Sequence, residues 1–142
     1  MVALRFCLSA LGAAILAMVA VLHLYWALGG NAGQSVSAPE LSGRAVLHLP
    51  RYSNALVALG LLAGALVLAA RSGALGSAAR TPVTAGAAGV MAVGFALRAL
   101  GDFRFLGFFK SVRGTPFADY DTWFYSPLCV CLALISAAAG LV

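Results

Sequence analysis

The sequence predicts an all-α membrane protein, a bundle of four transmembrane helices formed by a single domain that covers residues 1–142. Of its 142 residues, 63% are hydrophobic and only 9% are charged, which is too little polar surface for a soluble domain. Four apolar stretches approach the length of about 20 residues that a helix needs to cross the hydrocarbon core. None of these stretches alternates apolar with polar residues, so helices, rather than strands, satisfy their backbone groups in lipid.

The four spans differ in how readily they enter a bilayer. The first, residues 6–28, has no charge and is longer than the apolar region of a typical signal peptide, so we expect it to remain as a transmembrane helix. The second, 55–70, is short. The third, 83–100, is the weakest because it includes Arg98, which we expect near the interface or paired inside the bundle. The fourth covers 123–142.

Small residues are expected to mediate helix contacts, because lipid is as apolar as leucine and gives helices no hydrophobic reason to associate. Gly60 and Gly64 form a G-x-x-x-G motif in the second span. Gly86, Gly89 and Gly94 make one side of the third span thin. These glycines are the predicted positions of close helix approach.

Several classes of site are excluded by composition. The net charge of +5 comes from basic residues that flank apolar segments, which excludes a nucleic-acid interface. Cys7, Cys129 and Cys131 lie in apolar stretches without a C-x-x-C motif, so we expect them to face lipid or neighbouring helices. No metal-ligand spacing or cofactor motif is present, and His23 and His48 are not placed as a matched pair of haem ligands.

The two ends of the predicted bundle differ in polarity. One end collects the chain start, the loop at 71–81 and the C-terminus. The other collects the loops at 29–54 and 101–122, which are rich in His, Arg, Asp and aromatic residues. The count of Lys and Arg favours this polar end inside, but its acids offset several of those charges. We therefore expect both termini in the cytoplasm and the protein in the cell membrane.

The first span ends in a polar and aromatic segment. His23 and Trp26 are three residues apart and share a helix face. Tyr25 and Trp26 are typical of an aromatic belt at the membrane interface, or of ligand contacts. His23 lies about one turn inside that belt, where it either bonds to another helix or acts as a ligand or proton-transfer group.

The third span ends in alternating charges. Arg98 and Asp102 are four residues apart, so we expect an ion pair, or an anion or carbonyl site on Arg98 that Asp102 aligns. Arg104, Lys110 and the four phenylalanines within 103–109 follow. This segment is suited to lying among lipid headgroups.

The last span begins with a cap and a proline. We expect Pro127 in the first turn of the helix, where its missing N–H is not needed. Asp121 or Thr122 is then the N-cap, since negative charge is favoured at that end. Asp119 and Asp121 together exceed what a cap needs, so one of them can pair with an arginine or donate a proton. Tyr125 lies in the same segment.

The segments HLYWALGG and RALGDFRFLGFFKSVRGTPFADYDTWFYSPLC carry a family resemblance. They resemble a bacterial family of small four-helix membrane proteins classed as a domain of unknown function, and the resemblance covers nearly the whole chain. It implies a bacterial inner membrane protein and leaves the activity open. The residues that look typical of the family are His23, Tyr25, Trp26, Arg98, Gly101, Asp102, Arg104, Lys110, Thr115, Phe117, Asp121, Tyr125, Ser126, Pro127 and Leu128. Asp119 and Pro116 do not look like part of the motif.

Two functions compete. The first is a membrane protein that binds a lipophilic or anionic small molecule, or a partner protein, at its polar end. Its candidate ligand-binding residues are Arg98, Arg104, Lys110, Trp26 and Tyr25. The alternative is a small membrane enzyme, an isomerase or proton-initiated cyclase, that performs acid–base chemistry on a lipid or terpenoid-like substrate. Its candidate catalytic residues are His23, Asp102, Asp121 and Tyr125. Transport ranks lowest, because four helices leave little room for a pore unless identical chains associate.

Overall fold

The computed structural model describes residues 2–41, 44–45 and 50–141. Within these residues it confirms an all-helical fold with four helices that are long and apolar enough to cross a membrane. The first three are α1 (Val2–Ala27), α2 (Arg51–Arg71) and α3 (Pro82–Leu100). The fourth runs through α4 (Pro116–Tyr120), the π-helical turn η3 (Asp121–Tyr125) and α5 (Ser126–Gly140).

Short elements occupy the loops. In the first loop, η1 (Gln34–Val36) precedes β1 (Glu40–Leu41) and β2 (Arg44–Ala45), two strands of two residues each that pair antiparallel. The loop between α2 and α3 contains η2 (Ser77–Ala79). The sequence did not predict the two strands, and they are too short to change the fold class.

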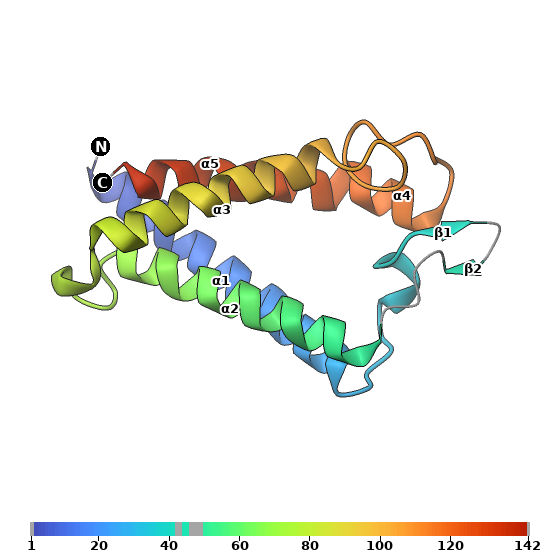
Figure 1. The fold of residues 1–142 in the computed structure, drawn as a ribbon, viewed down its shortest axis with the longest axis horizontal. Helices are drawn as coiled ribbons and strands as arrows, with labels where there is room; N and C mark the ends of the chain where they lie inside the picture. The colour runs from blue at the N-terminus through green and yellow to red at the C-terminus, as the bar shows by residue number, and fades with distance from the viewer. Residues whose placement is uncertain (1, 42–43, 46–49, 142) are drawn as a thin grey trace.

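The long helices form two pairs, with α1 beside α2 and α3 beside α5 (Figure 1). The pairs meet at the end that holds both termini and the α2–α3 loop, which we call the closed end. They diverge toward the end that holds the described residues of the first loop (28–41, 44–45 and 50) and the loop at 101–115, which we call the open end. The two polar loops therefore share one end of the molecule, as the alternating direction of four successive helices requires.

The apolar core lies toward the closed end and takes residues from all four helices. Leu16 of α1 and Leu68 of α2 pack with Ala88 of α3 and with Leu132 and Ile135 of α5. Leu68 is completely buried. Most other large apolar side chains on these helices point outward, which is the pattern of helices whose outer faces contact acyl chains rather than water.

The predicted positions of close helix approach are only partly correct. Gly64 contacts Met91 and Leu16, but a Cβ added at Gly60 would meet nothing within 4 Å. The same is true of the three glycines predicted to thin α3, which are Gly86, Gly89 and Gly94. Two close helix contacts that were not predicted are at Gly12, against Leu68 and Ile135, and at Gly140, against the backbone of Ala85. Glycine spacing alone did not identify which faces meet.

Polar contacts close the ends of two helices at the closed end. Thr81 and Thr84 form a reciprocal capping box at the start of α3, where each side chain accepts a hydrogen bond from the other's backbone N–H. Arg71, the last residue of α2, is buried, and its Nε donates to the carbonyl of Ala139 in α5 at 2.9 Å. This bond connects the two helix pairs where they meet.

Candidate functional site

The fourth helix widens by one π turn just before Pro127. A proline inside a helix has no N–H, and its ring collides with the carbonyl four residues earlier, here that of Trp123. The helix responds locally, and the N–H of Ser126 donates to the carbonyl of Asp121, five residues back, instead of four. This turn brings the side chains of Asp121 and Ser126 to the same buried position.

The predicted start of this helix is wrong. It begins at Pro116 rather than at residue 123, and its N-cap is Thr115, whose Oγ1 accepts from the N–H of Ala118 at 3.1 Å. Pro116 occupies the first turn, where a proline is tolerated. Asp121 is therefore inside the helix and not its cap, so its charge needs partners of another kind.

Asp121 is the centre of a buried ionic cluster at the open end. Its side chain is 0% exposed, and Oδ1 accepts from Arg98 Nη2 at 2.8 Å. Oδ2 accepts from Lys110 Nζ at 3.0 Å and from the N–H of Gly107 at 2.8 Å. The hydroxyl of Ser126 lies 3.3 Å from the same oxygen. A buried carboxylate with this many donors remains ionised, because each bond favours its charged form.

Lys110 is a structural member of this cluster. Its side chain is 1% exposed, and Nζ also donates to the carbonyl of Gly107 at 2.9 Å and to Thr122 Oγ1 at 2.7 Å. With the bond to Asp121, all three N–H groups of the ammonium have acceptors. Lys110 was a candidate ligand-binding residue, and the structure places it in the interior with no donor left for a ligand.

The predicted ion pair between Arg98 and Asp102 is wrong. The helix ends at Leu100, and Gly101, at φ 91°, turns the chain away, so the four-residue spacing no longer places the two side chains on one face. Asp102 Oδ1 accepts instead from the backbone N–H groups of the loop that follows. These N–H groups belong to Arg104, Phe105 and Leu106, at 2.9, 2.7 and 2.8 Å. Slight burial raises the pKa of Asp102. The backbone hydrogen bonds together lower the pKa by more than burial raises it, so the pKa lies below its ordinary value of 3.8.

The loop that follows α3 depends on two glycines. Gly101 and Gly107 both have positive φ, and they lie against each other's backbone. A Cβ on Gly101 would overlap the carbonyl of Leu106, and one on Gly107 would overlap that of Leu100. Only glycine fits this close approach. The loop thereby delivers the N–H of Gly107 and the side chain of Lys110 to Asp121.

A cavity of about 450 Å³ lies between the two helix pairs at the open end. Its walls are mostly apolar, with Leu61 of α2, Phe95 of α3 and Leu128 of α5 among the lining residues. Four of the predicted site residues also line it. They are His23 and Trp26 of α1, Arg98 of α3 and Tyr125 of η3. Volumes of about 300–1,000 Å³ with few polar groups are typical of small-molecule sites.

His23 and Trp26 form one unit on α1. The imidazole Nδ1 lies 2.9 Å from the carbonyl of Val19, and since a carbonyl can only accept, Nδ1 carries a proton. Nε2 has no partner among the described residues and is the ring nitrogen left for a ligand. The two rings meet edge to face with centroids 5.0 Å apart. The indole N–H of Trp26 donates to the carbonyl of Ala32 at 2.8 Å.

Tyr125 and Arg98 complete the polar part of the cavity wall. The hydroxyl of Tyr125 donates to the carbonyl of Val36 at 3.1 Å, which ties the fourth helix to η1. Arg98 makes its single side-chain hydrogen bond to Asp121 through Nη2. Nη1 is buried and has no partner in the part of the chain that the structure describes. The Arg98 side chain is 32% exposed, so it connects the buried cluster with the cavity.

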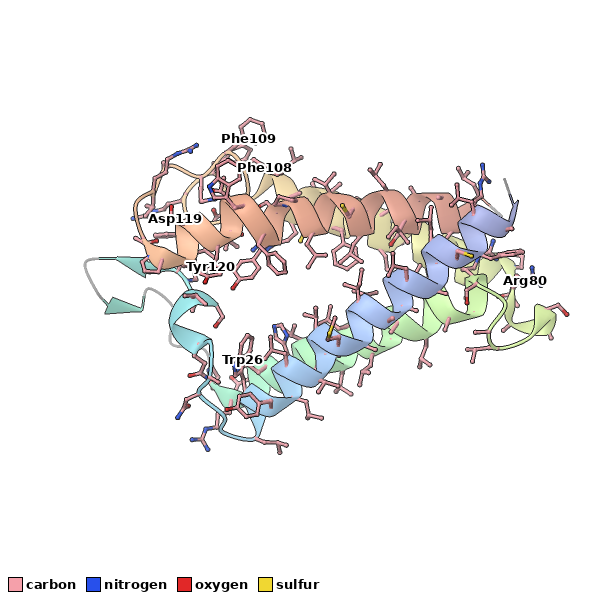
Figure 2. The ribbon with its side chains drawn as sticks, turned by 180° about the vertical axis from the view of Figure 1, so that it is seen from behind. Trp26, Arg80, Phe108, Phe109, Asp119 and Tyr120 are labelled. Atoms are coloured by element: carbon pink, nitrogen blue, oxygen red, sulfur yellow. The ribbon has the colours of Figure 1, made fainter. Side chains whose placement is uncertain are left out.

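The remaining candidates lie elsewhere. Tyr25 is exposed, and its hydroxyl accepts from the N–H of Ala32 at 3.4 Å. Arg104 is exposed and lies over the ring of Phe105, 5.0 Å from its centroid. Phe108 and Phe109 lie on the outer side of the α3–α5 pair, whereas Trp26 belongs to the α1–α2 pair (Figure 2). The prediction on His48 lies outside the described residues, and among those residues no group of three or more His, Cys, Asp or Glu side chains is suited to a metal ion.

Sequence reasoning missed several members of the site. Cys129 lines the cavity, although we expected it to face lipid or a neighbouring helix. Its spacing of four residues from Tyr125 would have placed both on one face. Gly107, Thr122 and Ser126 bond within the ionic cluster, and nothing in their spacing reveals this, because the π turn and the glycine loop create the contacts.

Comparison with known proteins gives one finding. The profile of a protein family described as "Protein of unknown function (DUF3995)" matches residues 16–136, a range that includes the cavity and the ionic cluster. No curated protein and no solved structure matches the chain.

Proposed function

Because the chain belongs to the DUF3995 family, whose function is unknown, we propose a function for it from the geometry of its cavity. The protein is a multi-pass membrane protein of the cell membrane that binds a lipophilic small molecule between its helix pairs. The apolar part of that molecule lies against the helix walls, and its polar group lies against Arg98. The observation that carries the proposal is the convergence of His23, Arg98 and Tyr125, from three separate helices, on one apolar cavity.

The membrane setting makes such a cavity accessible to lipid-soluble molecules. The helices that line it have outward-facing apolar side chains, so the surrounding medium in this proposal is hydrocarbon. We place both termini in the cytoplasm and the open end at the outer interface, where exposed Phe108, Phe109 and Trp123 match an aromatic belt. A reporter that functions on only one side of the membrane, fused to the C-terminus, tests this orientation.

Binding is better supported than acid–base catalysis. Of the four candidate catalytic residues, Asp121 accepts from two cations and Asp102 from three backbone N–H groups. Carboxylates held in this way stay ionised and are poor proton donors. The hydroxyl of Tyr125 already donates a hydrogen bond to the carbonyl of Val36. Of the two candidates that line the cavity, His23 has a ring nitrogen for proton transfer that is unpartnered among the described residues. One such group supports the enzyme less well than the cavity supports a ligand.

A cavity-filling variant tests the proposal. Leu61→Trp places an indole in the cavity, and Leu59→Trp is the matched control, since Leu59 is 63% exposed on the same helix. Native mass spectrometry of gently extracted protein identifies the co-purifying small molecule. We expect Leu61→Trp to lower its occupancy at least about tenfold, because a filled site loses its apolar contacts. Equal occupancy in the two variants would contradict binding at this site.

A further inference from the structure

We infer that the occupant of the cavity is a single-chain lipophile that ends in a carboxylate, with this head on the guanidinium of Arg98. The inference rests on the proposed function, since it names the class of molecule that the same cavity binds. It follows from the charge of the buried cluster, from the hydrogen-bond donors left in the cavity and from the size of the cavity.

The cluster behind the cavity has one more cation than it has anions. Arg98 and Lys110 both bind Asp121, and no other acidic side chain among those described bonds to either. Two positive charges and one negative charge leave a net charge of +1. All three N–H groups of Lys110 have acceptors, so the unbalanced charge belongs to Arg98, the member that reaches the cavity. Arg98 is one-third exposed and faces an apolar cavity, so an anionic occupant would neutralise its surplus charge there.

Arg98 also has most of the free donors. A guanidinium has five N–H groups, and Arg98 uses one of them on Asp121. The other four have no partner among the described residues. The two on Nη1 are buried, so one on Nε and one on Nη2 are left for a ligand. The indole of Trp26 and the hydroxyl of Tyr125 have already donated to backbone carbonyls. A head that only accepts hydrogen bonds therefore suits the Arg98 side of the cavity. A carboxylate does this with two oxygens, whose spacing matches the N–H fork of arginine.

Charge and volume restrict the class further. A carboxylate has one negative charge and neutralises the surplus of +1, whereas a phosphate monoester has about −1.5 to −2 at neutral pH and would exceed it. The cavity of about 450 Å³ is lined mainly by aliphatic and aromatic side chains. That lining suits an alkyl or isoprenoid chain attached to the head.

The two tryptophans of the chain permit a direct measurement. Trp26 lines the cavity, and Trp123 is 83% exposed, so the Trp123→Phe variant leaves Trp26 as the sole tryptophan, which can be excited selectively over the four tyrosines. The full chain is reconstituted in nanodiscs at about pH 8, where a carboxylic acid is ionised. It is then titrated with dibrominated stearic acid, with the corresponding alcohol and with the phosphate ester of that alcohol. Bromine quenches an indole only at short range, so quenching reports occupancy of the cavity.

We expect the acid to quench Trp26 saturably and to bind at least about tenfold more tightly than the alcohol or the phosphate ester, as a charge-assisted pair requires. Arg98→Gln should reduce the affinity for the acid to that for the alcohol. Arg104→Gln removes the same charge from an exposed site at the same end and should change neither affinity.

The outcomes are distinguishable. Equal affinity for the acid and the alcohol would overturn the inference that the ligand carries a carboxylate, and it would leave the proposed lipophile site intact. Tighter binding of the phosphate ester than of the acid would overturn it as well. No saturable quenching by any of the three would contradict the proposed function itself. The comparison of three heads on the Trp123→Phe chain does not need an Arg98 variant, so it decides the matter even if Arg98→Gln does not fold.

Discussion

The closed end and the open end of this molecule are held together by different forces. At the closed end, Leu16, Leu68 and Ile135 from three helices pack directly, and Gly12 and Gly140 allow the helices to approach. At the open end the helix pairs diverge, and one carboxylate, Asp121, binds groups from α3, from the loop that follows it and from the fourth helix. These polar bonds join α3, its loop and the fourth helix within one helix pair. The cavity lies between that pair and the α1–α2 pair, where the two pairs no longer pack directly.

The largest effect is expected from removing the centre of the ionic cluster. Asp121→Ala leaves Lys110 buried without a counter-ion and leaves Arg98 without its partner. Such a loss destabilises a protein by about 3–5 kcal/mol. Denaturant titration in detergent micelles measures the free energy of unfolding. The control, Asp119→Ala, removes an exposed acid from the same helix and should stay within about 0.5 kcal/mol. Similar losses in both variants would show that the cluster does not hold the open end.

A smaller effect is expected at the closed end. Leu68→Ala removes a completely buried side chain, a change that costs about 2–5 kcal/mol in a water-soluble protein. In lipid the surrounding chains are as apolar as leucine, so only the packing part remains and we expect about 1–2 kcal/mol. The same titration measures it, with Leu66→Ala, 61% exposed, as a nearly neutral control. A loss above about 3 kcal/mol would indicate exchange with water and contradict the membrane placement.

The smallest effect concerns Asp102 and its pH dependence. Its pKa is lowered in the folded protein by backbone hydrogen bonds, so its stabilising contribution is fully present above the unfolded pKa of about 3.9. That contribution is lost as the pH falls through the lower folded pKa. We expect Asp102→Asn to cost less than about 1 kcal/mol at neutral pH, since the group is exposed. The difference from the unchanged chain should shrink below about pH 4. A difference that stays constant down to pH 2 would show that the charge of Asp102 plays no part.

Hydropathy was sufficient to predict the four helices and the gathering of polar residues at one end. Long apolar runs leave the backbone no alternative to helix in lipid, and the alternating direction of the helices brings the first, third and last segments together. His23, Trp26, Arg98 and Tyr125 were all chosen on this argument, and all four line one cavity. Their roles stay predictions until a ligand is measured.

The two errors at the ionic cluster share a physical cause. Spacing rules hold only while a helix stays regular, and both of these predictions crossed an irregular point. Gly101 ends α3 before Asp102, so Arg98 pairs with Asp121 instead. Pro127 was interpreted as a helix start, whereas the helix tolerates it by widening one turn and begins at Pro116. These adjustments depend on tertiary contacts, which local sequence rules do not include.

The hydrogen bond from Tyr125 to the carbonyl of Val36 has a consequence for how a ligand would enter the cavity. It links η1 in the first loop to the fourth helix at the open end, where the two helix pairs are farthest apart. In the proposed function, a ligand that enters from the aqueous side would have to displace this contact, and a ligand that enters from the bilayer would pass between the two helix pairs. Such an arrangement would favour ligands that partition into the bilayer.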